Sequence, residues 1–374
     1  MIFKDKKLKT DWRNGSVGLI AILIFLLGCS LLAREKTEGV LPHGSAEEPV
    51  IMAYYVPERN FEPEEIPVEK LTHIIFSFTN VIEGEMRFRN PESAGPKLKA
   101  LVQQKKRNPD LKVMIACGGW GADGFSDMAL TEASRAKFIE SASEFIKKYQ
   151  LDGMDMDWEY PGISGAGTKA REVDTQNFTA LMKGLREMLD AFQTPKTLTF
   201  ASAGWKRYYD HVEMNEVMKY ADYTNVMTYD QVSGVSEYTG HHTPLGEVRS
   251  EEIQGTPFHD HLDSLFHAGS IPDPHPRSTQ KIVDFLIKEG VNPKRIVIGA
   301  AFYGRVWKGV SPNNNGLYQK SGGIHIGWIP YHQIRKIYEP DTDFQRFWDE
   351  TAKAPYMYNS VDSLMVSYDD TVSV

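Results

Sequence analysis

The stretch Asp152-Gly-Met-Asp155-Met-Asp157-Trp158-Glu159-Tyr160-Pro161 places Asp155, Asp157 and Glu159 two positions apart in a segment typical of a β-strand. Side chains two positions apart in a strand point to the same face, so the three carboxyl groups are expected to lie together. Carboxylates that close raise one another's pKa, and burial raises it further. At least one of the three is therefore predicted to hold a proton near neutral pH, as a general acid must.

The other residues of this stretch are expected to have structural roles. Asp152 has the opposite parity from the three acids, which indicates a turn or cap residue. Met154 and Met156 alternate with the acids and are predicted to pack on the outer face of the strand. A buried structural network is a second interpretation of Asp155 and Asp157, and it is compatible with the first. For Glu159 the alternative is a solvated acid at the strand end.

Composition defines a globular protein and excludes several classes of function. The 374 residues are 41% hydrophobic and 25% charged, which excludes disorder for most of the chain. A formal net charge of -8 argues against binding nucleic acid or an anionic membrane surface and favours a neutral substrate. With only Cys29 and Cys117 present, no disulfide is expected. No cofactor is expected either.

The amino terminus has the pattern of an export signal. Five basic residues precede an uncharged run at 17–27, which is shorter than the roughly 20 residues of a membrane span. The sequence Leu26-Leu27-Gly28-Cys29 resembles the bacterial lipobox, in which the cysteine is acylated and becomes the new amino terminus. We therefore expect a lipoprotein signal peptide at 1–28, lipidation of Cys29 and a flexible tether at 29–48. An uncleaved anchor and a plain signal peptide are the alternatives.

From residue 49 onward, apolar strands alternate with amphipathic helices, the pattern of a parallel sheet built from βα units. Seven strands are predicted, at 50–56, 73–79, 112–117, 151–159, 197–203, 223–228 and 295–301. Because no glycine-rich phosphate loop follows any strand, a (β/α)8 TIM barrel is favoured over a doubly wound sheet. The carboxyl ends of such strands carry the chemistry of a barrel, and Trp120, Glu159 and Asp230 fall there.

The expected domain organisation has three parts after the tether. Strands one to seven of the barrel occupy 49–305, with a long irregular excursion at 231–277. A small α+β insertion is predicted at 306–370, where glycine, asparagine, tyrosine and proline are frequent and a helix is expected near 330–338. Residues 371–374 would begin the return to the barrel.

Two histidine clusters suggest a metal site but are expected not to form one. His241-His242 and His259-Asp260-His261 have suitable side chains, but they lie in a long irregular segment, and ligands need convergent geometry. No metal site is predicted.

Four segments, in the expected order, are similar to the motifs of family 18 glycoside hydrolases, the chitinases. The run 152–161 resembles the family's Asp-x-x-Asp-x-Asp-x-Glu motif, and Gly118-Gly119-Trp120 resembles its third-strand segment. Met227-Thr-Tyr229-Asp230 is similar to its sixth-strand Met-x-Tyr-Asp, and Tyr303-Gly304-Arg305 to its seventh-strand Tyr-Gly-Arg. The resemblance covers residues 50–374 and implies the branch with an α+β insertion and a deep cleft.

The resemblance implies a retaining hydrolysis in which the substrate supplies the nucleophile. Glu159 would protonate the glycosidic oxygen, and Asp157 would orient the acetamido N–H of the sugar. Asp155 would share a proton with Asp157, so that the two titrate as a coupled pair. Tyr229 would donate to the acetamido oxygen, and Asp230 would bind sugar hydroxyls near the scissile bond.

Aromatic and polar side chains are expected to line the sugar site, because sugars present apolar faces edged with hydroxyls. By the family's pattern the candidates are Tyr54, Phe78, Trp120, Met227, Tyr303 and Arg305. A place in the core is the alternative for Tyr54, Phe78 and Trp307, since buried aromatics are usually core residues.

The leading hypothesis is a monomeric chitinase acting on chitin or chito-oligosaccharides. An endo-β-N-acetylglucosaminidase of the same family is the alternative enzyme, but Trp158 and Tyr160-Pro161 resemble chitinases. A chitin-binding lectin is the alternative from another class; such proteins usually lack the acid, whereas Glu159 is present.

One feature departs from the family pattern. The family closes its barrel with an eighth strand, and residues 366–370 resemble the last strand of the insertion, so the eighth strand is expected to be missing from this chain. Unpaired sheet edges favour aggregation. The expectation is therefore that residues 30–374 alone are poorly soluble and nearly inactive.

Overall fold

The computed structural model describes residues 49–57 and 61–374. The predicted signal peptide at 1–28, Cys29 and the predicted tether at 29–48 lie outside the described residues, so these predictions remain untested. Within the described part, no helix is both long enough and apolar enough to cross a membrane.

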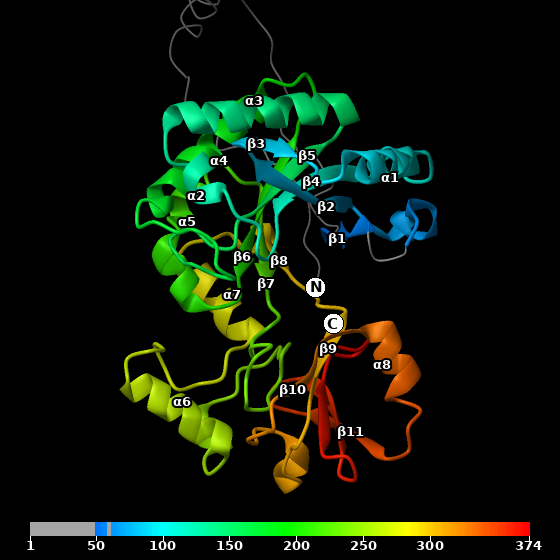
Figure 1. Ribbon diagram of the computed structural model, residues 1–374, viewed down its shortest axis with the longest axis vertical. Helices are drawn as coiled ribbons and strands as arrows, with labels where there is room; N and C mark the ends of the chain where they lie inside the picture. Colours follow the sequence, from blue (N-terminus) through cyan, green and yellow to red (C-terminus); the bar gives the residue numbers. More distant parts are fainter. Residues whose placement is uncertain (1–48, 58–60) are drawn as a thin grey trace, which may run out of the picture. The chain divides into compact units, whose positions relative to one another are not determined.

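The main sheet contains seven parallel strands and one short antiparallel strand, β3, which pairs with β2 (Figure 1). The order of the parallel strands is β1 (Met52–Tyr55), β2 (His73–Ile82), β4 (Lys112–Gly118), β5 (Gly153–Asp157), β6 (Thr197–Ala203), β7 (Tyr223–Met227) and β8 (Ile296–Ile298); β3 is Glu85–Arg87. This sequential order confirms the predicted β/α barrel architecture with seven barrel strands. Among the described residues, β1 and β8 are the two edges and do not pair with each other.

Helices follow most of the strands and pack on the outer face of the sheet. The α-helices of the barrel part are α1 (Pro91–Gln103), α2 (Phe125–Met128), α3 (Glu132–Tyr149), α4 (Asp174–Asp190), α5 (Met214–Val217) and α7 (Thr279–Lys288). Helix α6 (Pro257–His267) lies in the excursion at 231–277, and its Phe258 is buried in a separate core cluster with Trp307. In α3, Phe138, Ala142, Ile146 and Tyr149 recur at three- and four-residue steps and are all buried. Met154 and Met156 belong to the same core cluster, as predicted from their parity.

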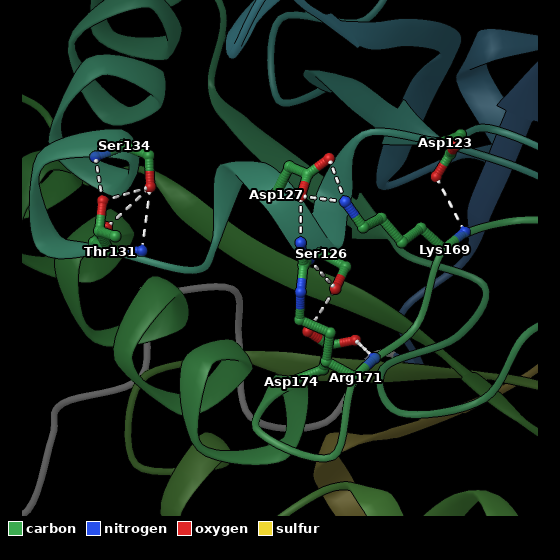
Figure 2. A network of polar contacts seen from close by, with 8 residues as sticks. All are labelled: Asp123, Ser126, Asp127, Thr131, Ser134, Lys169, Arg171 and Asp174. Carbon is green, nitrogen blue, oxygen red and sulfur yellow. Dashed lines mark hydrogen bonds and ion pairs between the residues drawn. The ribbon is translucent and has the colours of Figure 1, made fainter.

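Side-chain caps define where several helices begin. Thr131 and Ser134 form a capping box at the start of α3, each side chain accepting from the backbone N–H of the other (Figure 2). The side chain of Ser278 accepts from the N–H of Lys281 at the start of α7. Asp152 accepts from the N–H of Val113, which agrees with its predicted structural role.

The insertion is a five-stranded antiparallel sheet with one helix. The strand order is β10 (Ile324–Pro330), β9 (Tyr303–Trp307), β13 (Leu364–Ser367), β12 (Ala354–Asn359) and β11 (Phe344–Asp349), and the helix is α8 (Tyr331–Ile337). Trp307 is fully buried in one of the sheet's two cores, which supports the core interpretation of this residue.

The segment Tyr303–Arg305 lies in this small sheet and not in a barrel strand. β8 ends at Ile298, and the chain turns at Phe302, whose φ of 53° lies in the left-handed region. The expectation that the Tyr-Gly-Arg segment belongs to the seventh barrel strand is therefore wrong in its placement. The turn brings Tyr303 and Arg305 to Asp230 from the side of the insertion.

The excursion at 231–277 covers one face of the small sheet. Val232, Val248, Ile253 and Phe258 are buried in the same core cluster as Trp307. The backbone N–H of His242 also donates to the hydroxyl of Ser367 in β13. This long segment is thus ordered by packing that its irregular sequence did not reveal.

A close backbone contact fixes the acidic strand β5 next to β4. A Cβ atom placed on Gly118 would lie only 1.8 Å from the carbonyl oxygen of Asp157, and Gly118 has a φ of 131°. The next N–H, that of Gly119, donates to this same carbonyl at 2.9 Å. Only glycine allows the end of β4 to lie this close to Asp157.

Replacing Gly118 by alanine is expected to lower the free energy of unfolding by about 3 kcal/mol, because the new methyl group overlaps backbone atoms of Asp157. Gly167→Ala is the matched control: its φ is 79°, but no atom lies within 4 Å of the added Cβ, so about 1 kcal/mol of backbone strain is expected. Urea unfolding of both variants measures the difference. Equal losses would show that the close contact has no role of its own.

Candidate active site

Asp155 and Asp157 of β5, with Glu159 just beyond its end, form the centre of the candidate active site. Asp155 is fully buried and accepts three hydrogen bonds: from the hydroxyl of Thr199 at 2.5 Å, from the hydroxyl of Tyr54 at 3.1 Å and from the amide of Asn225 at 3.2 Å. Burial raises the pKa of Asp155 to about 6, although these hydrogen bonds oppose the shift. This carboxyl group is therefore held in one position by three other strands.

Asp157 has a different environment from Asp155. It is buried, and its Oδ1 atom has no hydrogen-bond partner among the described residues. Burial and the charges of Glu159 and Asp155 raise the pKa of Asp157 well above its ordinary value. A buried carboxyl group without a cationic partner is more stable with a proton, and that proton can donate to a neighbouring oxygen.

Glu159 lies two residues beyond the end of β5 and is 7% exposed. Burial, with a further contribution from the charge of Asp230, raises the pKa of Glu159 to about 7. A carboxyl group with this pKa is partly protonated at neutral pH, so it can both give and receive a proton.

Asp230 is the opposite case, a carboxylate that is kept ionised. It follows β7 with a φ of 57°, and it accepts from the hydroxyl of Tyr303 at 2.6 Å and from the guanidinium of Arg305. Although burial opposes it, contacts with His242, Arg305 and Tyr303 hold the pKa of Asp230 below its ordinary range. Asp230 is thus an ionised carboxylate, in contrast to Asp155, Asp157 and Glu159, whose pKa values are raised.

His242 connects the end of β7 with the start of β9. Its Nδ1 accepts from the backbone N–H of Asp230 at 3.3 Å, and its Nε2 lies 2.9 Å from the carbonyl oxygen of Tyr303. The same Nδ1 atom also lies 3.4 Å from a carboxylate oxygen of Asp230. His242 is a fully buried structural residue.

The other histidines of the two clusters contact side chains that are not metal ligands arranged around a common centre. His241 lies 3.0 Å from Asp349, and His261 stacks on Tyr238. Nowhere in 49–57 or 61–374 do three or more His, Cys, Asp or Glu side chains gather as a metal site would require.

The predicted sugar-lining residues differ in exposure. Trp120 is 68% exposed beyond the end of β4, and Tyr54 is 40% exposed although its hydroxyl reaches Asp155. Phe78 and Met227 are partly buried, and Phe78 packs against Gly119. Tyr229 lies 6.1 Å from Tyr303 between ring centroids.

Tyr229 keeps its phenolic proton over the whole physiological range. Burial and the charges of Asp157 and Glu159 raise the pKa of Tyr229. Its hydroxyl is therefore available as a hydrogen-bond donor beside the acids.

Sequence reasoning missed the residues that hold Asp155 and Asp230 in place. Thr199 lies opposite Asp155 in the register of β5 and β6, and Asn225 lies on the next strand, β7. Thr199 and Asn225 could have been found from the sequence, because each is a polar residue within an otherwise apolar barrel strand. Nothing in the local sequence distinguishes His242 from the neighbouring His241.

A β/α barrel with carboxyl groups gathered at the carboxyl ends of its strands has the arrangement of a glycoside hydrolase. The model of glycosyl hydrolases family 18 matches residues 50–374. The chain belongs to this family.

Two chitinases are similar in sequence to much of this chain. Chitinase A1 of Niallia circulans is 34% identical over 286 residues, which are 73% of this chain and 39% of that protein. Chitinase B of Serratia marcescens is 29% identical over 372 residues, covering 85% of this chain and 71% of that protein. The chain thus spans about two fifths of the first relative and about seven tenths of the second.

Solved structures show the same fold. A family 18 N-acetylglucosaminidase from Paenibacillus barengoltzii has a TM-score of 0.75 and 36% identity, covering 87% of this chain and 89% of that one. The Group IV chitinase of Ostrinia furnacalis has a TM-score of 0.76 and 26% identity, covering 87% of each chain.

The raised pKa of Asp155 predicts a pH-dependent stability. A carboxyl group whose pKa is about 6 when folded and about 4 when unfolded binds its proton more tightly in the folded state. Its contribution is most favourable below about pH 4 and is lost as the pH rises through about 6. The difference in free energy of unfolding between the wild type and Asp155→Asn should therefore fall by about 3 kcal/mol between these limits.

Urea unfolding at closely spaced pH values measures this difference, in which groups that do not interact with Asp155 cancel. Asp110→Asn, at an exposed position, is the control and should give a nearly constant difference. A constant difference for Asp155→Asn as well would contradict the raised pKa.

Proposed function

We propose that the chain is a chitinase that hydrolyses β-1,4 links between N-acetylglucosamine units and retains the anomeric configuration. The observation that carries the proposal is the set of three buried carboxyl groups, two on β5 and Glu159 just beyond its end, with the pKa of Glu159 raised to about 7. Membership of family 18 and the two chitinase relatives support the substrate class.

In the first step Glu159 gives its proton to the glycosidic oxygen while the bond from this oxygen to the anomeric carbon breaks. The acetamido carbonyl oxygen of the same sugar forms a new bond to that carbon and yields an oxazolinium ion. Water then attacks the anomeric carbon, and Glu159, now ionised, takes its proton. The acetamido group is restored, so the enzyme returns to its starting state.

The other acids assist the acetamido group. Asp157 would accept the acetamido N–H and stabilise the positive charge of the intermediate. Asp155 would share a proton with Asp157, since the charge of Asp155 contributes to the raised pKa of Asp157. Tyr229, protonated at every relevant pH, would donate to the acetamido oxygen.

Sugar binding would combine stacking with hydrogen bonds. The exposed indole of Trp120 offers a flat apolar surface for a sugar ring, and Tyr54, Phe78 and Met227 would complete the apolar lining. Asp230, Tyr303 and Arg305 would bind hydroxyl groups as one hydrogen-bonded cluster. The substrate would be chitin or a chito-oligosaccharide.

A second candidate is an N-acetylglucosaminidase that releases single sugars, because the structure with 36% identity belongs to an N-acetylglucosaminidase. The chemistry of the acids would be the same, and only the products would differ. An endo-β-N-acetylglucosaminidase acting on glycoproteins has less support, because Trp158 and Tyr160-Pro161 resemble chitinases. A non-catalytic lectin also has less support, since Glu159 is present.

We further propose that the protein is exported as a monomer and attached to the cell envelope through a lipid on Cys29. The support is the sequence alone, since residues 1–48 lie outside the described part. The mass of the mature amino-terminal peptide would decide between lipidation and plain secretion.

Replacing Glu159 by glutamine is expected to reduce hydrolysis of chito-oligosaccharides at least about 1000-fold, because the amide cannot transfer a proton. Binding of the oligosaccharide should stay within about threefold, since the shape of the side chain is kept. Glu144→Gln, at an exposed position on α3, is the matched control and should leave turnover unchanged.

The measurement is a product time course on labelled chitohexaose, with a glycoprotein as a second substrate. Release of disaccharides indicates a chitinase, release of single sugars the N-acetylglucosaminidase, and cleavage of the glycoprotein the endo-enzyme. Near-normal turnover by Glu159→Gln would overturn the assignment of the acid.

A further inference from the structure

We propose that a polar network between α2 and the β5–α4 loop positions Trp120 for sugar binding. We name this network the loop clamp, and the loop in question spans residues 160–173. The clamp consists of Asp123, Ser126, Asp127, Lys169, Arg171 and Asp174 (Figure 2). The inference rests on the proposed function and adds a positioning role for residues that do not belong to the acid cluster.

The inner half of the clamp is buried. Ser126 and Asp174 are fully buried, and the hydroxyl of Ser126 donates to Oδ1 of Asp174 at 2.7 Å. Oδ2 of Asp174 accepts from the backbone N–H of Arg171 at 2.7 Å and from that of Gly162 at 3.4 Å. One carboxylate therefore holds both ends of the loop.

The outer half of the clamp is made of ion pairs. Asp127 pairs with Lys169 at 2.8 Å and with Arg171, whose guanidinium also donates to the hydroxyl of Ser126 at 2.6 Å. The backbone N–H of Lys169 donates to Asp123 at 3.1 Å. These contacts tie the second half of the loop to the segment that follows Trp120 in the chain.

The loop held by the clamp lies against Trp120. A Cβ atom on Gly165 would be 3.4 Å from the indole ring and 3.7 Å from the carbonyl oxygen of Glu159. A Cβ atom on Gly121 would be 3.8 Å from the side chain of Ala166. The loop backbone thus packs against the indole, while 68% of Trp120 remains exposed for a ligand.

The exposed indole is flanked by glycines in the chain, and its ring also lies 6.4 Å from that of Tyr160 between centroids, at the start of the loop. Gly119 and Gly121 have φ values of 92° and 77°, and glycine permits many other backbone conformations. If the loop were free to move away, sugar binding would have to order the indole, and the entropy lost would weaken binding. The clamp would reduce this loss by holding the loop, and hence Trp120, in the binding orientation before the sugar arrives.

The exposure of the outer ion pair allows a positioning role to be tested apart from a role in folding stability. Side chains of Lys169 and Asp127 are 50% and 57% exposed, and exposed ion pairs contribute little to folding. Asp127→Asn should therefore fold normally while loosening the loop. Asp127→Glu keeps the charge and serves as the conservative variant.

A double-mutant cycle tests the proposal, with chitohexaose binding measured by calorimetry on a Glu159→Gln background so that no hydrolysis occurs. Asp127→Asn should weaken binding about threefold to tenfold when Trp120 is present. On a Trp120→Ala background the same change should have less than about a twofold effect, because the indole to be positioned is gone. Asp127→Glu should recover most of the affinity.

Kinetics on the active enzyme supply a second readout. Asp127→Asn should raise KM for chitohexaose by a similar factor and leave kcat within about twofold. The control is Glu216→Gln, which breaks the exposed pair of Glu216 with Lys219 near α5 and should change neither constant.

Three results would overturn the proposal: unchanged affinity in Asp127→Asn, an equal loss on both backgrounds, or a fall in kcat without a rise in KM. If the Glu159→Gln parent binds no oligosaccharide at all, the proposed function fails, and the clamp's role in sugar binding fails with it. Normal binding by the parent with no effect of Asp127→Asn would reject the clamp alone.

Discussion

The burial of three carboxyl groups in and just beyond β5 is the constraint on which the site depends. Carboxyl groups in an apolar barrel, without a cation against them, favour their protonated forms, and the raised pKa values of Asp155, Asp157 and Glu159 follow from this. Such an arrangement lowers stability unless hydrogen bonds offset it, and Asp155 receives them from three other strands. Buried acids of this kind are typical of functional sites.

The ionised carboxylate of the site, Asp230, depends on residues outside the barrel strands. Asp230 follows a barrel strand, but two of the groups that, with His242, keep it ionised, Arg305 and Tyr303, belong to the small sheet. His242 links the two through backbone groups on either side. The insertion thereby supplies charge and hydroxyl groups to a barrel whose own acids have raised pKa values, and the two kinds of carboxyl group can have different roles.

Much of this arrangement could be predicted from sequence, because it depends on local periodicity. The two-residue spacing predicted a cluster of Asp155, Asp157 and Glu159, whose charges do interact although Glu159 lies beyond the end of the strand. The seven barrel strands occur where apolar runs predicted them. Contacts between distant segments could not be predicted in the same way. Thr199 reaches Asp155 only through strand register, and Tyr303 leaves the barrel because of a left-handed residue at Phe302. The family was predicted from the resemblance of four short motifs, and periodicity alone would not have identified it.

The central claim is that Glu159 holds its proton near neutral pH because it is buried among other acids. Infrared spectroscopy of the protein with isotope-labelled glutamate carboxyl groups tests it directly, with the difference from Glu159→Gln isolating the one side chain. The protonated carboxyl band of Glu159 should lose half its intensity near pH 7. Loss of that band near pH 4, which is about the ordinary range of a solvated glutamate, would contradict the account.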